Sequence, residues 1–205
     1  MTLDMFDHKF FPGFNLQPTD IPRALAPFTA GMPLERSRLA ILTEVSQLRL
    51  FREEIYKPLR ANLHVDTGLA AKMAYFFPVA FQDPFLKKAQ LTLGLIAANF
   101  RARGFEMTTD LTAYADYRVP QVLRHLGVLE YAPALAAMID SGKQIPSGSA
   151  EETAIRAATI LACAKLAARK QMTDAEVDSW LFEKSRDTDF QKNAKPFHLT
   201  VTTHY

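Results

Sequence analysis

The stretch from residue 149 to residue 170, SAEETAIRAATILACAKLAARK, decides the fold of this 205-residue chain. From residue 157 to residue 168 it is apolar apart from Thr159 and Lys165. An apolar run of this length, with helical spacing and no breaker, is typical of a helix packed on several sides. We therefore expect a domain that is built around this central buried helix.

The rest of the chain also shows mostly helical patterns. Thr173, followed three residues later by Glu176, forms a capping box that starts one of these helices. Only residues 198–203 have the alternation of an extended segment, and we expect this C-terminal tail to lie across the helices. The sequence thus predicts an all-α, single compact domain over residues 1–205. Further helices are expected at residues 18–29, 33–63, 67–78, 84–103, 110–115, 120–126, 132–141 and 173–183.

Composition limits the class of protein. With 48% hydrophobic residues, the chain can bury a core without disulfide or metal staples. A single cysteine, Cys163, no evident signal peptide and no apolar run of bilayer length favour a cytoplasmic protein without a membrane partner. The net charge of +2, with acids and bases interspersed, disfavours a polymeric nucleic acid as partner. The five scattered histidines predict no metal site, and we expect no cofactor.

Residues 115–124, ADYRVPQVLR, place Asp116 and Arg118 just before a proline. The residue before a proline is biased away from helical backbone, so residues 116–118 should form an irregular turn, with Pro120 as the first residue of a helix. Such a turn can aim the Asp116 carboxylate into a cavity. The alternative is that Asp116 caps the helix or pairs with Arg118 on the surface.

Residues 83–90, DPFLKKAQ, contain two lysines near the start of an expected helix. Asp83 is a good N-cap and Pro84 a good first helical residue. Lys87 and Lys88 then lie near the positive end of the helix dipole, where they are unfavourable unless an anion such as phosphate binds between them. The alternative is that both lysines are simply solvated.

The central helix carries two charges that need partners. Glu152 and Arg156 are four residues apart on one face, so they can pair with each other. The alternative is that one of them orients a catalytic group or a ligand.

The segment from Tyr75 to Tyr205 resembles the queuosine salvage proteins, which are queuosine 5′-phosphate N-glycosylases that release the base queuine from its nucleotide. The matching blocks follow in family order at near-family spacing. They are residues 83–90, residues 111–123, Leu126, Gly127, Tyr131, Gly148, Glu152, Ile155, Arg156, residues 196–198 and Tyr205. The resemblance implies hydrolysis of the N-glycosidic bond of queuosine 5′-phosphate, so that queuine can be salvaged for tRNA modification.

The resemblance also implies roles for individual residues. It makes Asp116 the catalytic carboxylate and Lys87 a ligand of the 5′-phosphate. Further substrate-binding candidates are Arg118, Glu152, Arg156 and His198. Breaking an N-glycosidic bond passes through an oxocarbenium-like sugar, whose positive charge a nearby carboxylate stabilises.

Two departures from the family lie near the ends of the chain. The aromatic, tryptophan-containing stretch that helps larger members to enclose the base is absent from residues 1–30, which form a divergent arm. Phe6, Phe10, Phe11 and Phe14 either replace that stretch or pack as a short hydrophobic arm. After His198, Leu199 and Val201 stand where larger members have basic residues.

Two other function classes stay open. Residues 145–149 faintly resemble the hairpin element with which helical DNA glycosylases grip phosphates, and we expect the fold to resemble those enzymes. A nucleic-acid base glycosylase of this kind flips a base into its pocket. The other class is a catalytically inactive helical protein that binds a metabolite or a partner.

Overall fold

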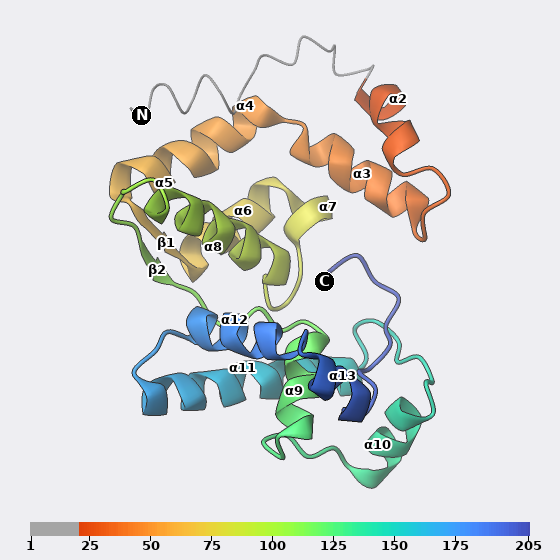
Figure 1. Ribbon diagram of the computed structural model, residues 1–205. Helices are drawn as coiled ribbons and strands as arrows, with labels where there is room; N and C mark the ends of the chain where they lie inside the picture. Colours follow the sequence, from red (N-terminus) through yellow and green to blue (C-terminus); the bar gives the residue numbers. More distant parts are fainter. Residues whose placement is uncertain (1–20) are drawn as a thin grey trace.

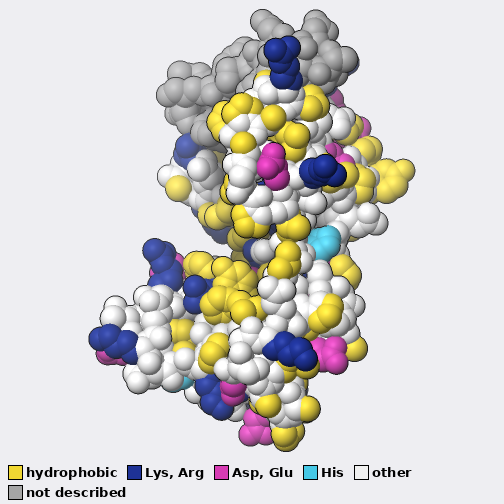
Figure 2. All heavy atoms as spheres, turned by 90° about the vertical axis from the view of Figure 1, so that its right-hand side faces the viewer, with side chains coloured by type: hydrophobic (Ala, Val, Ile, Leu, Met, Phe, Trp, Pro, Cys, Tyr) yellow, Lys and Arg dark blue, Asp and Glu magenta, His cyan; other side chains and the backbone are white. Residues whose placement is uncertain are grey.

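The computed structural model describes residues 21–205, which form two groups of helices stacked one above the other (Figure 1). The first group contains residues 21–110, and the second contains residues 118–193. Figure 2 shows a narrow waist between the two groups from the side. The first group consists of α2 (Ile21–Leu25), η1 (Ala26–Phe28), α3 (Glu35–Val45), α4 (Leu48–Phe51), η2 (Arg52–Tyr56), α5 (Lys57–Asn62), β1 (His64–Asp66), α6 (Thr67–Phe76), α7 (Pro78–Phe81), α8 (Lys87–Arg101) and β2 (Thr108–Asp110).

The first group has its own hydrophobic core, which α5, α6 and α8 enclose. Phe77 and Phe100 are 1% exposed at its centre, and Leu93 contributes from the inner face of α8. Two short strands, β1 and β2, pair in parallel, with Val65 opposite Thr109. The sequence analysis missed these strands because each is only three residues long, too short for a period-two pattern to be recognised.

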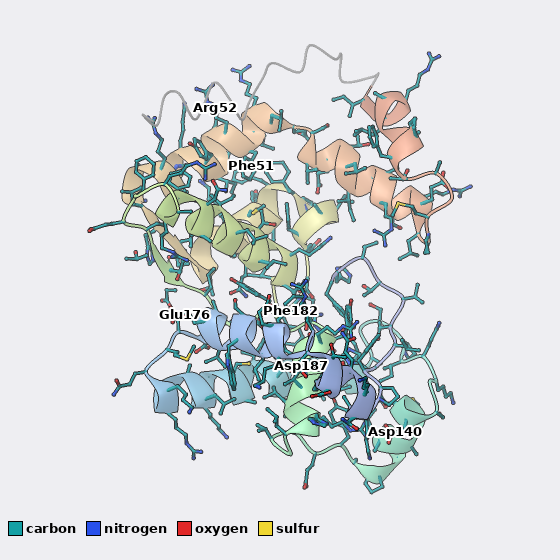
Figure 3. All side chains as sticks on the ribbon, in the orientation of Figure 1. Phe51, Arg52, Asp140, Glu176, Phe182 and Asp187 are labelled. Atoms are coloured by element: carbon teal, nitrogen blue, oxygen red, sulfur yellow. The ribbon has the colours of Figure 1, made fainter. Side chains whose placement is uncertain are left out.

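The second group packs around a helical hairpin. It consists of α9 (Arg118–His125), α10 (Pro133–Asp140), α11 (Ala150–Lys170), α12 (Asp174–Lys184) and α13 (Thr188–Asn193). The predicted capping box of Thr173 and Glu176 is confirmed at the start of α12, where Figure 3 labels Glu176. Cys163 from α11, Leu181 from α12 and Leu123 from α9 form the centre of this second core.

The helix predicted over residues 149–170 is confirmed as α11, with Ser149 as its N-cap. It buries one face and not its whole circumference, because Ala162 and Cys163 are covered while Leu161 is 63% exposed. The predicted, predominantly helical fold is confirmed. Within this fold, α11 lies at one side of the second group and not at its centre.

The long helix predicted over residues 33–63 is interrupted. After α3, Gln47 leaves helical backbone with φ −73° and ψ 61°, and the Ser46 hydroxyl donates to the Thr43 carbonyl. A Ser hydroxyl bound to its own turn competes with the helical hydrogen bonds. The chain then continues through α4, a π-helical turn at residues 52–56 and α5.

The helix predicted at residues 110–115 was wrong, since residues 111–116 are irregular. Side chains from other helices accept hydrogen bonds from backbone N–H groups of this segment. The Thr112 N–H donates to Gln90 Oε1 of α8 at 2.9 Å, and the Tyr114 N–H donates to Asp178 Oδ1 of α12 at 2.9 Å. The segment therefore crosses between the two groups as an extended link that both anchor.

A glycine of α8 makes room for this link. A Cβ atom at position 94 would collide with the Tyr114 hydroxyl, so Gly94 allows the tyrosine to lie against the helix.

The chain ends in a non-helical tail, as predicted. Within residues 195–205 the tail forms one parallel bridge, in which the Ile145 N–H donates to the Leu199 carbonyl at 2.8 Å. Figure 1 shows the C-terminus between the two helical groups. Phe6, Phe10, Phe11 and Phe14 lie outside the described residues. A single domain over residues 1–205 and a likeness to helical DNA glycosylases stay predictions.

Candidate active site

The turn that carries Asp116 begins with an unusual backbone. Ala115 has φ +40°, a left-handed conformation that costs energy for a residue with a Cβ and that is common at functional sites. Asp116 Oδ1 then accepts the N–H groups of Arg118 at 2.8 Å and Val119 at 3.0 Å. The carboxylate therefore caps α9, which is the alternative that the sequence analysis gave to a carboxylate aimed into a cavity.

This cap corrects the predicted start of the helix. The turn at residues 116–118 is shorter than expected, and α9 begins at Arg118, so Pro120 is its third residue. Proline is tolerated there because the N–H groups of the first turn have no helical partner in any case. Within residues 21–205, Asp116 Oδ2 accepts no hydrogen bond, so one carboxylate oxygen is left for a ligand.

Lys87 and Asp178 lie within electrostatic reach of Asp116. Burial lowers the pKa of Lys87, whereas the negative charges of Asp116 and Asp178 oppose that change. Burial and the negative charge of Asp116 raise the pKa of Asp178 to about 7, against the Tyr114 N–H and Lys87, which favour its ionised form. Two carboxyl groups and an ammonium group thus come together from the turn before α9, from α12 and from the start of α8.

The sequence analysis missed Asp178. The residue is 4% exposed and lies between Val177 and Leu181 on the buried face of α12. An acid on the apolar face of an amphipathic helix is the signal that could have identified it, because a buried carboxyl group needs a partner or a function.

The lysine cluster also begins differently from the prediction. Leu86 adopts φ +53°, and α8 begins at Lys87, three residues later than Pro84. The prediction of Asp83 as N-cap was therefore wrong, since Leu86 takes that position and Pro84 and Phe85 form a turn before it. Asp83 Oδ2 nevertheless accepts the first N–H of the helix, that of Lys87, at 2.8 Å. The side chains of Lys87 and Lys88 are half-buried and not freely solvated.

Arg156 joins the two turns that carry Lys87 and Asp116. Its guanidinium group binds both carboxylate oxygens of Asp83 at 2.7 Å, and Nε donates to the Ala115 carbonyl at 3.0 Å. The Glu152 carboxylate is farther away, at 3.4 Å. The predicted pairing of Glu152 with Arg156 is therefore present, but Asp83 is the principal partner. Because the Arg156 side chain is only 3% exposed, its position supports an orienting role.

His198 and Tyr205 bring the tail into this buried network. His198 is 2% exposed, and its Nε2 lies 3.3 Å from the Tyr205 hydroxyl. Burial lowers the pKa of His198 to about 4, although the nearby Glu152 charge opposes the shift. The Arg156 guanidinium lies 4.7 Å from the centre of the Tyr205 ring and 4.6 Å from that of the Phe85 ring. These contacts fix the end of the chain beside the acid cluster.

Arg118 lies in an aromatic wall next to Asp116. Its guanidinium group is 4.8 Å from the centre of the Phe197 ring and 5.5 Å from that of Tyr117. The Tyr117 and Phe197 rings themselves are 4.8 Å apart. The structure therefore brings all six predicted site residues to one region, and their roles as ligands of a substrate stay predictions.

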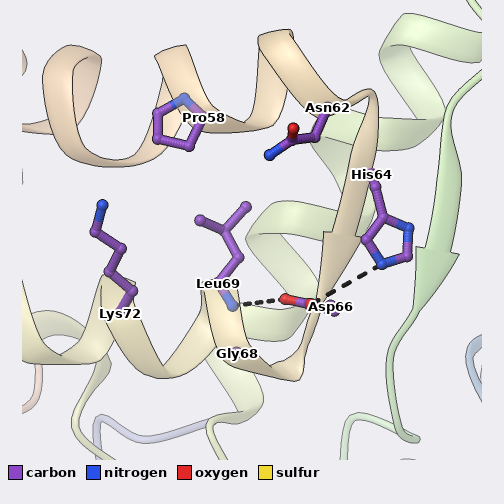
Figure 4. A pocket seen from close by; sticks show the side chains of 7 residues that line it. All are labelled: Pro58, Asn62, His64, Asp66, Gly68, Leu69 and Lys72. Atoms are coloured by element: carbon purple, nitrogen blue, oxygen red, sulfur yellow. Dashed lines mark hydrogen bonds and ion pairs between the residues drawn. The ribbon is translucent and has the colours of Figure 1, made fainter.

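Features elsewhere in the described residues do not form a comparable cluster. A pocket of about 340 Å³ lies beside β1 and α6 (Figure 4), but Asp66 there caps α6 through the Leu69 N–H. Lys72 pairs with Glu54 at 3.2 Å. Within residues 21–205 no group of three His, Cys, Asp or Glu residues has metal-binding geometry, and no helix is long and apolar enough to cross a bilayer.

The motifs of this cluster agree with comparisons to known proteins. A sequence model described as "Queuosine salvage protein" matches residues 5–205. The chain belongs to the queuosine salvage protein family. Three relatives named queuosine 5′-phosphate N-glycosylase/hydrolase come from Sphaerobacter thermophilus, Dictyostelium discoideum and Mus musculus, with 39%, 35% and 26% identity. The matches cover 59–60% of this chain and 40% of each of these relatives.

Proposed function

We propose that this protein hydrolyses the N-glycosidic bond of queuosine 5′-phosphate and releases queuine. Family membership and the names of the relatives support the reaction and the substrate. The observation that carries the proposal is that hydrogen bonds bring three segments with Asp116, Asp178 and Lys87 together. Asp178 accepts the Tyr114 N–H, and Arg156 joins the Ala115 carbonyl to Asp83, which accepts the Lys87 N–H. The cytoplasmic location stays a prediction.

Asp116 is suited to the sugar end of this reaction. As the bond to the base lengthens, positive charge develops at the anomeric carbon of the ribose, and a fixed carboxylate stabilises it. Because Asp116 Oδ1 is held by two backbone N–H groups, the carboxylate has a defined direction, and no residue from 21 to 205 forms an ion pair with it. Its Oδ2 can stabilise the cationic sugar or orient the attacking water.

Asp178 is suited to proton transfer. A carboxyl group with a pKa of about 7 is partly protonated near neutral pH, whereas a solvated aspartic acid is not. We assign it the role of a proton donor that assists departure of the base. Two carboxyl groups in environments that separate their proton affinities are a common arrangement for such a division of roles. Lys87 supplies positive charge beside both of them.

A direct assay tests the proposal. The purified protein is incubated separately with queuosine 5′-phosphate, queuosine and guanosine monophosphate, and the free bases are measured by mass spectrometry. We expect queuine from the queuosine nucleotide and little release from guanosine monophosphate. Tight binding of queuosine 5′-phosphate without release of queuine would contradict the enzyme and favour a binding protein. Release of a base from an oligonucleotide alone would favour a nucleic-acid base glycosylase.

Replacing Lys87 tests its predicted role as a phosphate ligand. Lys87→Ala should raise KM for queuosine 5′-phosphate by about tenfold or more, because a charge-assisted contact to phosphate is worth about 1.5–3 kcal/mol. KM for unphosphorylated queuosine should change much less. Steady-state kinetics with both substrates measure the difference, and equal losses for both would mean that Lys87 serves the carboxylates alone.

The raised pKa of Asp178 predicts the pH dependence of the reaction. If its proton assists the leaving base, kcat/KM should fall above about pH 7, and Asp178→Asn should lower kcat/KM and remove this decline. Asparagine can still accept the Tyr114 N–H, so residues 111–116 keep their anchor. Glu183→Gln, an exposed acid on the same helix, is the matched control and should leave the profile unchanged. An unaltered decline in Asp178→Asn would contradict the assignment.

Stability gives a second measure of the same carboxyl group. Its folded-state pKa lies above the value of 3.8 for a solvated aspartate, so the folded protein binds more protons between about pH 4 and pH 7. The contribution of Asp178 to stability therefore falls as the pH rises through this range. Urea unfolding of Asp178→Asn and wild type is measured at pH 5 and at pH 8. The free energy of unfolding of the variant, relative to that of wild type, should be higher at pH 8 than at pH 5.

A further inference from the structure

The outer face of α11 is apolar and lies uncovered among the described residues. Leu161 marks its centre and is 63% exposed. With 3.6 residues per turn, the positions that share this face are those three, four and seven residues away from Leu161. Five of these six positions are alanine, so α11 presents a flat, mostly apolar surface to solvent. The six residues are Ala154, Ala157, Ala158, Ala164, Lys165 and Ala168.

This face differs in composition from the solvent side of the neighbouring helix. The exposed side of α12 carries Glu183 and Lys184, and charged residues of this kind are usual on a helix surface in water. Of the seven positions on the α11 face, Lys165 alone is charged, and its long stem can lie over apolar groups. From Ala154 to Ala168 the face runs for about 21 Å, at 1.5 Å per residue. A continuous apolar face of this length indicates contact with a partner.

Two charges near the ends of α11 share one edge of this face. Glu151 lies in the first turn and Arg169 in the last, and both are exposed. They are separated by about five full helical turns, so the two side chains lie on the same edge, about 27 Å apart. The helix dipole favours their signs, but it does not require a common edge. In the part of the chain that the structure describes, neither forms an ion pair.

A second copy of α11 supplies the matching charges if it runs antiparallel to the first. A two-fold axis would then pass at Leu161, and Ala154 would lie opposite Ala168 of the partner subunit. Glu151 is ten residues before the axis and Arg169 of the partner subunit is eight residues beyond it, so their levels along the helix would differ by about 3 Å. The symmetry places both on one edge, so this ion pair would form twice. A parallel pair would bring like charges together instead.

The small side chains suit a close approach of two helices. With alanine at most contact positions, the helix axes can lie near the lower end of the usual range of about 8–10 Å. Leu161 of each copy would then pack against Ala158 and Ala164 of the partner subunit, as a knob in a hole. A contact along one helix from each copy is small for a specific interface, so we expect a dissociation constant in the micromolar range.

We propose that two copies of this chain form a dimer through antiparallel pairing of α11. Leu161 lies at the two-fold axis, and Glu151 pairs with Arg169 of the partner subunit. Glu152 and Arg156 lie on the opposite, buried face of α11, so each copy keeps its own candidate active site. The dimer does not depend on the proposed reaction.

Sedimentation equilibrium of the purified chain tests the dimer. Over a series of micromolar concentrations, the average mass of the wild type should rise from that of a monomer toward that of a dimer. Leu161→Glu brings two like charges together at the axis and should weaken dimerisation about a hundredfold or more. Val128→Glu, at a site that is 45% exposed outside α11, is the control and should dimerise as wild type does. Circular dichroism checks that both variants are folded.

Charge reversal tests the ion pairs at the edge of the face. Glu151→Arg and Arg169→Glu should each weaken dimerisation about tenfold, because each places like charges at two contacts. The double variant restores opposite charges and should return close to the affinity of the wild type. A wild type that stays monomeric at every concentration would overturn the proposal. A folded Leu161→Glu that dimerises as wild type does would overturn it too.

Engineered cysteines test the antiparallel register. The two copies of residue 161 meet at the axis, so Leu161→Cys should form a disulfide between subunits on mild oxidation. Two copies of residue 154 would be about 21 Å apart, so Ala154→Cys should stay a monomer under denaturing, non-reducing electrophoresis. The native Cys163 is buried and serves as the background in the wild type. A disulfide in Ala154→Cys but not in Leu161→Cys would overturn the pairing.

Discussion

Asp116→Asn should lower kcat for queuosine 5′-phosphate by at least about a hundredfold. The substitution removes the negative charge that faces the developing oxocarbenium ion, and loss of one preorganised electrostatic group commonly costs a factor of 10² to 10³ in turnover. The variant should still fold, because the amide oxygen of asparagine can accept the N–H groups of Arg118 and Val119 as Oδ1 of Asp116 does. The measurement is queuine release under saturating substrate.

Asp187→Asn is a closely matched control. Asp187, labelled in Figure 3, caps α13 by the same geometry, with Oδ1 accepting the N–H groups of Asp189 at 2.9 Å and Phe190 at 3.0 Å. Its charge is not among those that shift the pKa of Lys87 or Asp178, so its substitution should change stability slightly and leave turnover unchanged. Near-normal turnover in Asp116→Asn would show that its carboxylate serves only as a helix cap.

Local sequence patterns predicted those parts of the site whose residues are all close together in the sequence. The Asp116 turn and the lysines near the start of α8 each lie within ten residues, and Ser149 and Thr173 mark helix starts directly. Local rules failed where a distant side chain replaces a local hydrogen bond. Gln90 and Asp178 bind the backbone of residues 112–114, and this removes the helix that the local pattern predicts.

The assembly of the site was not predictable from local patterns for the same reason. Arg156 and Asp83 are separated by 73 residues, and Asp178 and Tyr114 by 64. Helical spacing suggested Glu152 as the partner of Arg156, since that pair is local. The structure instead gives Arg156 a bidentate contact with Asp83 in the turn before α8. The periodicity of neither helix predicts this contact.

Arg156→Met should lower the free energy of unfolding by about 3–5 kcal/mol, the cost typical of removing one partner from a buried ion pair. The Asp83 side chain is fully buried and that of Glu152 is 3% exposed, so the variant leaves two carboxylates without their shared cation. The chain also loses the donor to the Ala115 carbonyl and the surface on which the Tyr205 ring packs. Chemical denaturation measures the loss.

The appropriate control is another bidentate pair in a more exposed place. Arg124 binds both oxygens of Asp140, at 2.6 and 3.0 Å, but the Asp140 side chain is 34% exposed. Arg124→Met leaves the Asp140 carboxylate, which water can solvate and which also lies 3.5 Å from Lys195, so this variant should cost less than about 1 kcal/mol. Similar losses from Arg156→Met and Arg124→Met would contradict the view that the fold depends on the Arg156 network more than on an exposed ion pair.

Arg156→Lys separates stability from positioning. Lysine keeps the positive charge but cannot bind Asp83 with two nitrogens and the Ala115 carbonyl with a third, so the turns that carry Lys87 and Asp116 lose their common anchor. We expect this variant to stay folded at the assay temperature and to lose about tenfold or more in kcat, because small displacements of a catalytic group are costly. KM should change little if Arg156 acts through the two turns. A rise in KM with unchanged kcat would instead make Arg156 a ligand of the substrate, as the family resemblance first implied.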